Sequence, residues 1–144
     1  MLRKATLQET KEAAHLALML WPGHTLEELI EDMKQLIIQP EAAVILAYDN
    51  NKTIGFAQCQ LRYDYVEGTG SSPVGYLEGL YVKEAFRKQG IGKNLVGFCE
   101  NWAKQKGCSE FASDCELENK ESLAMHLKLG FTEANRVICF TKKL

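Results

Sequence analysis

Hydrophobic positions follow a helical period in the first part of the chain and a strand-like pattern in the next part. The pattern predicts, in chain order, a strand over residues 2–5, helices over 8–20 and 26–37, and strands over 42–48 and 53–63. The turn Asp49-Asn50-Asn51-Lys52 joins the last two as an antiparallel hairpin. Phe56 breaks the alternation just after Gly55, which indicates a β-bulge there.

The second half of the chain has the order strand, helix, strand. The pattern predicts a strand over 74–82, a helix over 90–106 and a strand over 108–115. Two strands joined through a helix run parallel with a right-handed crossover. Asn119 is expected to cap a short helix that Gly130 closes, and residues from Phe131 onward are expected to supply one or two final strands. The expected fold class is α/β (α+β), with a mixed, mostly antiparallel sheet and helices packed on it.

Composition limits the classes of protein that remain. The chain has 144 residues, 46% of them hydrophobic and 25% charged, which fits a single globular domain over residues 1–144. The net charge of −2 does not favour nucleic acid as a partner. No apolar run approaches the roughly 20 residues that span a bilayer, so neither a membrane nor a signal peptide is expected and the protein should be cytoplasmic. No C-x-x-C pair is present, and no metal is expected.

The loop after residue 82 is suited to binding phosphate. The chain passes from a strand into a loop with two glycines and several cations, and the loop opens directly into a helix. Glycines allow an anion to approach the backbone, and the free N–H groups and dipole of a helix N-terminus attract it. The expected contacts are Arg87, Lys88, Gln89, Gly90, Ile91, Gly92 and Lys93. The alternative is a tight turn with solvated surface cations, because glycine turns are common.

The segment R-K-Q-G-I-G (87–92) resembles the R/Q-x-x-G-x-G/A signature of the GNAT acetyltransferases. The order of elements is similar to that family over essentially the whole chain, and Ala124 to Phe131 is similar to its closing helix. The resemblance implies the GNAT fold, with a parallel strand pair that splays apart. It also implies acetyl-CoA as co-substrate, with pantetheine bonded to the backbone of Leu80, Tyr81 and Val82 and the pyrophosphate held by the glycine loop.

One position departs from the family pattern. GNAT enzymes commonly place a tyrosine four residues before the final glycine, as the acid for the departing thiolate, and here that position is His126. A histidine can donate this proton, and it can equally be an ordinary residue on a helix face.

Further segments are similar to the aminoglycoside 6′-N-acetyltransferases. They include L-W-P-G-H (20–24), R-Y-D-Y-V-E-G-T (62–69), L-E-G (77–79), and Ser113-Asp114 with Asn119 and Ser122. This resemblance implies that the acceptor is an aminoglycoside or a related polycationic amine, and that two copies of the chain form a homodimer. It also implies that Asn119 lies at the cofactor.

Carboxylates and aromatic side chains are the candidates for binding a cationic sugar. Strand alternation is expected to place Glu78, Leu80 and Val82 on one face, where Glu78 would bind or deprotonate the acceptor ammonium. The alternative for Glu78 is a buried ion pair with an arginine or lysine. Asp114, at the end of the neighbouring parallel strand, is expected to face the same crevice between the strands as Glu78. Its alternative role is an Asx cap on the following loop. Trp21, His24 and Tyr65 are expected to contact the sugar rings, although a packing role for Trp21 is equally consistent with the sequence.

Two other functions remain open at this stage. One is a GNAT enzyme for another small amine or polyamine, since acidic residues alone suit any polycation. The other is a non-catalytic acyl-CoA-binding sensor, which the missing tyrosine allows and Glu78 argues against.

Overall fold

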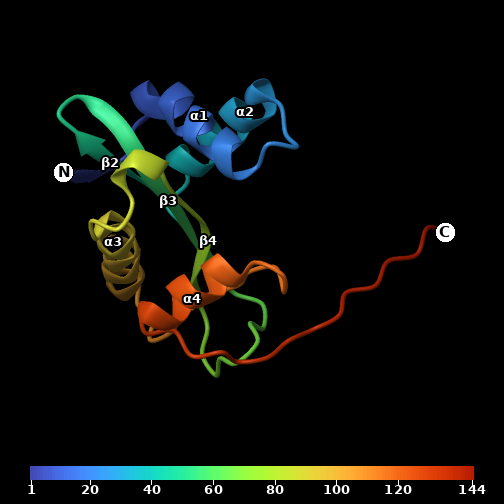
Figure 1. Cartoon of the computed structure of the whole chain (residues 1–144). Helices are drawn as coiled ribbons and strands as arrows, with labels where there is room; N and C mark the ends of the chain where they lie inside the picture. The colour runs from blue at the N-terminus through green and yellow to red at the C-terminus, as the bar shows by residue number, and fades with distance from the viewer.

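The computed structural model describes all 144 residues and contains one five-stranded sheet with helices against it (Figure 1). Its elements are, in chain order, β1 (Leu2–Lys4), η1 (Leu7–Glu9), α1 (Thr10–Leu20), α2 (Leu26–Ile38), β2 (Ala42–Asp49), β3 (Lys52–Arg62), β4 (Val74–Val82), η2 (Glu84–Phe86), α3 (Ile91–Gln105), β5 (Phe111–Ser113) and α4 (Lys120–Lys128). The strands lie in the order β1-β2-β3-β4-β5, and every neighbouring pair is antiparallel except β4 and β5. The predicted mixed, mostly antiparallel sheet with one parallel pair is confirmed.

Helices cover both faces of the sheet. On one face, Leu95 and Trp102 of α3 pack in a core cluster with Ile45 of β2. On the other face, Met33 of α2 packs with Phe56 of β3. Because β2 contributes side chains to both clusters, its sequence is a continuous apolar run without alternation. Burial of each such large side chain stabilises the fold by roughly 1.5–3 kcal/mol. None of the helices is both long enough and apolar enough to cross a membrane.

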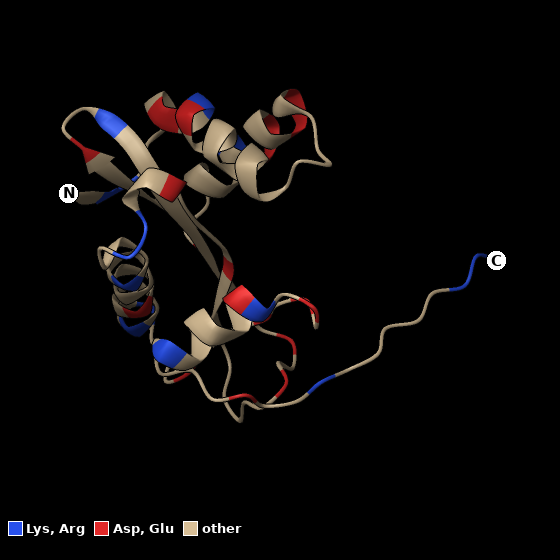
Figure 2. Cartoon of the chain, viewed as in Figure 1, with Lys and Arg blue, Asp and Glu red and all other residues tan.

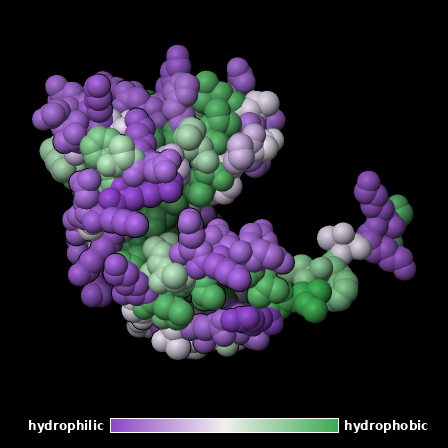
Figure 3. All heavy atoms as spheres, in the orientation of Figure 1, coloured by the Kyte–Doolittle hydropathy of each residue, from purple (hydrophilic) through white to green (hydrophobic).

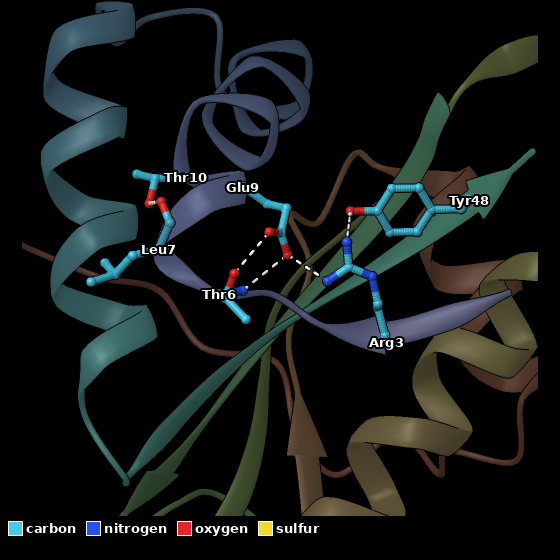
Figure 4. A network of polar contacts seen from close by, with 6 residues as sticks. All are labelled: Arg3, Thr6, Leu7, Glu9, Thr10 and Tyr48. Atoms are coloured by element: carbon cyan, nitrogen blue, oxygen red, sulfur yellow. Dashed lines mark hydrogen bonds and ion pairs between the residues drawn. The ribbon is translucent and has the colours of Figure 1, made fainter. Parts of the chain in front are cut away.

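A buried carboxylate joins β1, β2 and the start of the helical layer (Figure 4). Glu9 accepts hydrogen bonds from Arg3 Nη1 at 2.7 Å, from the Thr6 backbone N–H at 3.1 Å and from the Thr6 hydroxyl at 2.8 Å. Arg3 Nη2 donates to the hydroxyl of Tyr48 at 3.2 Å. Burial acts to raise the pKa of Glu9, but the Thr6 hydrogen bonds and the Arg3 charge lower it overall. The ionised carboxylate therefore stabilises this corner of the fold.

The sheet contains two β-bulges. Between β2 and β3 the register shifts so that Ile54 has no partner, which confirms the irregularity predicted beside Gly55. Between β3 and β4 the register shifts between Gln58 and Cys59, which leaves Glu78 as the extra residue. The sequence pattern gave no sign of this second bulge.

The bulge changes the face on which Glu78 lies. Leu80 and Val82 pack towards α3. Glu78 instead bonds to Arg62, whose guanidinium lies over the ring of Tyr76, so these three side chains share the opposite face. The expectation that Glu78 shares a face with Leu80 and Val82 is wrong, because an inserted residue shifts strand alternation by one.

β4 and β5 separate after a short parallel stretch. The paired residues are Gly75 with Phe111, Tyr76 with Ala112 and Leu77 with Ser113. Residues 74–77 of β4 are buried, and residues 78–82, which have no partner on the β5 side, are half-buried. The predicted strand over 108–115 is thus reduced to three residues. After Ser113 the chain leaves β4 and turns towards α4.

The final strands predicted after Phe131 do not form. Residues 131–144 have no regular secondary structure. Phe131 packs on Phe111 and His126, and Ala134 lies beside Gly68. The residues that follow lead away from the rest of the chain along an extended path (Figure 1). Val137, Ile138 and Phe140 are 65%, 80% and 87% exposed. A strand needs a neighbour for its backbone N–H and C=O groups, and within one chain this segment has none. The prediction is therefore wrong for the single chain.

Candidate active site

The loop between β4 and α3 presents cations and unpaired N–H groups at one point. Gly90, the N-cap of α3, has a left-handed φ of +83° and no side chain with which to satisfy the first helical turn. The N–H groups at the start of α3 are therefore free to bind an external anion. Lys88 and Lys93 are exposed beside them, and the basic residues of this loop and helix are visible in Figure 2.

The start of α3 lies directly against the unpaired half of β4. A Cβ atom built on Gly92 would lie 4.0 Å from Leu80 Cδ2 and would touch nothing closer. Arg87 folds back onto the strand, donating from Nε to the Val82 carbonyl at 2.7 Å, and its guanidinium lies 5.5 Å from the Tyr81 ring centre. The structure thus brings the glycine loop and the strand segment 80–82 together at one edge.

A chain of polar contacts crosses the sheet at the other end of this edge. Arg62 binds Glu78 through two hydrogen bonds, of 2.9 Å from Nε and 2.7 Å from Nη2. The same guanidinium lies 3.4 Å from the Tyr76 ring centre, and the Tyr76 hydroxyl donates to Asp114. The ion pair that the sequence left open as an alternative for Glu78 is therefore present. Sequence reasoning gave no role to Arg62 or Tyr76.

Charge and burial stabilise the protonation states in this chain of contacts. The hydrogen bonds to Glu78 raise the pKa of Arg62. Burial raises the pKa of Tyr76 strongly, and the hydrogen bond to Asp114 raises it further. Tyr76 therefore remains a hydrogen-bond donor. Glu78 and Asp114, although 36 positions apart in sequence (114 − 78), are connected through only two intervening side chains.

The three aromatic candidates occupy different environments. Trp21 is half-buried, makes an edge contact with Phe56 at 6.1 Å, and lies so close to Gly79 that a Cβ there would approach its ring to 2.6 Å. It therefore has a packing role beside Glu78. His24 and Tyr65 are exposed on loops, and their polar partners are nearby glutamates at 3.3 and 3.4 Å. A hollow separates the α1–α2 layer from α4 on the face shown in Figure 3.

His126 of α4 is held at the point where β4 and β5 separate. Its Nε2 lies 2.7 Å from Ser113 Oγ, and its Nδ1 lies 2.7 Å from the Ser122 carbonyl oxygen. The His126 and Phe131 rings are in a T-shaped contact, with their centres 5.1 Å apart. Asn119 acts as the N-cap of α4 by accepting from the Ser122 backbone N–H at 3.1 Å, as predicted for a cap.

A hollow of about 460 Å³ lies between α3 and the end of α4. Its lining residues are Lys93, Asn94, Val96, Gly97, Phe98, Glu100, Asn101, Lys128 and Leu129. Apart from Lys93, sequence reasoning assigned none of them to a site. The sequence did contain a sign of this hollow, because Asn94, Gly97 and Asn101 are spaced so that they lie on one face of the helix. The hollow runs from Lys93, near the start of α3, to Lys128, at the end of α4.

Comparison with known proteins defines the class of protein that has this arrangement. The sequence matches the acetyltransferase (GNAT) family over residues 7–131, and the chain belongs to that family. It is 43% identical over 141 residues to an aminoglycoside N(6′)-acetyltransferase type 1 of Acinetobacter baumannii, with 96% of both chains covered. It is 40% identical to the enzyme of that name from Acinetobacter haemolyticus, covering 99% of this chain and 98% of the relative.

Solved structures of aminoglycoside 6′-N-acetyltransferases have a fold similar to that of this chain. The structure of AAC(6′)-Iy in complex with the bisubstrate analogue CoA-S-monomethyl-acetylneamine is similar over 100% of this chain and 98% of that one, with a TM-score of 0.96 and 36% identity. The structure of AAC(6′)-Ih from Acinetobacter baumannii is similar with a TM-score of 0.94 and 40% identity, over 100% of this chain and 98% of that one. The predicted GNAT fold is confirmed.

Proposed function

We propose that this protein transfers the acetyl group of acetyl-CoA to the 6′-amino group of aminoglycoside antibiotics and thereby confers resistance to them. The observation that carries the proposal is the unpaired edge of β4. One end of that edge meets the anion-binding start of α3, and the other end meets the carboxylates Glu78 and Asp114. An anionic donor and a cationic acceptor can therefore meet along five residues of one strand, 78–82. Relatives of about 40% identity carry the corresponding name.

The proposed donor site follows this edge. The pyrophosphate of acetyl-CoA would accept hydrogen bonds from the first N–H groups of α3, with Lys88 and Lys93 supplying positive charge. The pantetheine arm would bond to the free backbone of Leu80, Tyr81 and Val82 in place of the missing strand partner. Remaining contacts would come from Gln89, Gly90, Ile91, Gly92, Arg87 and Asn119.

The proposed acceptor site is acidic. Carboxylates cluster around the loops beside α4 in Figure 2, and Asp114 and Glu78 are the two that lie at the sheet. An amine attacks a thioester only when it is neutral, so a base must remove a proton from the ammonium group. We assign this step to Glu78, directly or through a water molecule. Trp21, His24 and Tyr65 would contact the sugar rings from the neighbouring loops.

The remaining chemical steps concern the thioester. A backbone N–H near Leu80 would stabilise the oxyanion that develops as the amine attacks. The CoA thiolate then needs a proton, and His126 is proposed as the residue from which that proton ultimately comes, because it occupies the position of the family's usual tyrosine. Because the reaction consumes acetyl-CoA, we also propose that the protein acts in the cytoplasm.

A thiol-release assay tests the function. Acetyl-CoA with kanamycin or tobramycin should release CoA, and product NMR should show acetylation of the 6′ amine. An analogue with a hydroxyl at 6′ should not be N-acetylated there. Acetylation at the 3-amine would refute the regiochemistry, turnover of spermidine alone would indicate a polyamine enzyme, and binding of acetyl-CoA without turnover would indicate a sensor.

We also propose that the protein is a homodimer. The C-terminal residues Val137, Ile138 and Phe140 are largely exposed in the single chain, and β5 has an open edge because it is the last strand of the sheet. Pairing of the tail with a second copy would bury these side chains and satisfy its backbone. Light scattering should give the mass of two chains for the wild type, whereas Phe140→Asp should shift it towards one. A monomeric wild type would contradict the proposal.

A further inference from the structure

The hydrogen bonds of His126 determine which of its nitrogens carries a proton. The Ser122 carbonyl oxygen, 2.7 Å from Nδ1, is only an acceptor, so Nδ1 is a donor. In the neutral ring Nε2 has a lone pair, and the hydroxyl of Ser113 at 2.7 Å donates to it. Both nitrogens are thus engaged, and the ring also contacts Phe131. No proton of His126 is directed at an open part of the site.

Ser113, in contrast, lies where a thioester would end. It is the last residue of β5 that pairs with β4, opposite Leu77, and its Oγ lies 3.4 Å from the Leu77 carbonyl oxygen. The next residue of β4 is Glu78, at which the unpaired edge begins. We call the place where β4 and β5 separate, between Leu77 and Glu78, the fork. A pantetheine arm bonded to residues 80–82 would direct its sulfur towards this fork. The serine hydroxyl is therefore the polar hydrogen that β5 presents there.

The charge of His126 controls the direction of that hydroxyl. In the neutral ring the Ser113 hydrogen is used by Nε2. In the imidazolium form Nε2–H donates to Ser113 Oγ, and the serine hydrogen is released towards the Leu77 carbonyl or towards a group in the fork. Protonation of the histidine thus makes the serine a donor to the site.

We propose that Ser113 gives its proton to the departing CoA thiolate and that His126 replaces this proton through Nε2. The proposal rests on the acetyl transfer proposed above. As the C–S bond of the tetrahedral intermediate breaks, its electron pair goes to sulfur. The Ser113 hydroxyl proton moves to sulfur, and the Nε2 proton moves to Ser113 Oγ. The products are the thiol, the amide and neutral His126.

The protons of the complete reaction balance without any further reagent. The acceptor ammonium loses two protons when it becomes an amide. One of them recharges His126 for the next turnover, and the other is released to water. The hydroxyl of Tyr76 does not compete with Ser113 for the thiolate, because it already donates to Asp114.

The test compares the acetyl thioester of CoA with its acetyl selenoester. A selenolate leaves without needing a proton, so a residue that protonates the leaving group matters for the thioester alone. Ser113→Ala should lower kcat with acetyl-CoA by about 10²-fold, the scale of lost general-acid catalysis, while CoA affinity by calorimetry stays unchanged. With the selenoester the variant and the wild type should differ by less than about threefold.

Two further variants separate the relay from a structural role. Ser113→Thr keeps the hydroxyl in a residue suited to strands and should retain most of the activity. Ser113→Ala combined with His126→Phe should be no slower than either single variant, because the two residues act as one unit. Melting temperatures check that each variant folds.

The outcomes distinguish this proposal from the proposed function. If the wild type releases CoA with an aminoglycoside and Ser113→Ala matches it, the relay is wrong and the function stands. An equal loss with thioester and selenoester, or a threonine variant as slow as alanine, also overturns the relay. If the wild type itself does not turn over any aminoglycoside, both proposals fail.

Discussion

Replacing Gly92 by aspartate separates the stability of α3 from its capacity to bind acetyl-CoA. Gly92 is the second residue of α3, and a Cβ atom there meets only Leu80 Cδ2, at the ordinary contact distance of 4.0 Å. An acidic residue in the first turn interacts favourably with the helix dipole by about 0.3–1 kcal/mol. Removing a glycine from a helix adds roughly 0.5–1 kcal/mol. We therefore expect Gly92→Asp to melt at the same temperature as the wild type or at a higher one.

The affinity of Gly92→Asp for acetyl-CoA should fall, although its stability should be unchanged or higher. The new carboxylate would lie among the N–H groups proposed to hold the pyrophosphate. Two like charges about 4 Å apart repel by about 1 kcal/mol in water and by about 4 kcal/mol at an effective dielectric constant near 20. The start of α3 is open to solvent, so a value of about 2 kcal/mol is appropriate, and it corresponds to about a 30-fold loss of affinity.

Calorimetry with acetyl-CoA measures this effect, and Gly92→Asn is the matched control. Asparagine has nearly the size of aspartate without its charge, so the ratio of the two dissociation constants isolates the electrostatic repulsion. Raised salt should narrow the difference, because the site is exposed. Equal dissociation constants for the two variants would show that no phosphate lies at the start of α3, and the proposed donor site would have to be moved.

Three further predictions concern single carboxylates. Glu78→Gln should lower kcat by about 10²–10⁴-fold, and higher pH should partly restore it because more of the acceptor amine is already neutral; a near-normal kcat would mean that Glu78 only balances Arg62. Asp114→Asn should raise the acceptor KM more than it lowers kcat, with no rescue at high pH, since it removes attraction for the cationic acceptor; steady-state kinetics across pH decides between these patterns. Glu9→Gln should destabilise the fold by about 2 kcal/mol near neutral pH. Because the pKa of Glu9 is lowered on folding from its ordinary value of 4.5, its contribution is present above that value and is lost as pH falls through the lower folded pKa. Urea titrations of wild type and variant should therefore converge at acid pH, and a constant difference would contradict the linkage.

The order of elements and the class of fold were determined by the sequence alone, through its hydrophobic periodicity and its turn residues. The helical spacing of α1, α2 and α3, the hairpin turn at 49–52 and the parallel pair β4–β5 are local or nearly local signals, and each is present in the structure. The glycine loop was likewise recognisable, because phosphate binding needs adjacent glycines and a helix start in one short segment. Asn119 was recognisable as a cap for the same reason.

The tertiary structure decided the features that depend on how distant segments meet. A bulge is set by the register of two strands, so alternation within β4 alone gave the wrong face for Glu78. The pairing of Arg62 with Glu78 and of Ser113 with His126 joins residues 16 and 13 positions apart, and no periodic pattern encodes such contacts. The end of β5 at Ser113 and the unpaired tail depend on whether a neighbouring strand exists to satisfy backbone hydrogen bonds. A sequence reports the propensity of a segment, whereas pairing requires a partner that only the folded chain, or a second chain, can supply.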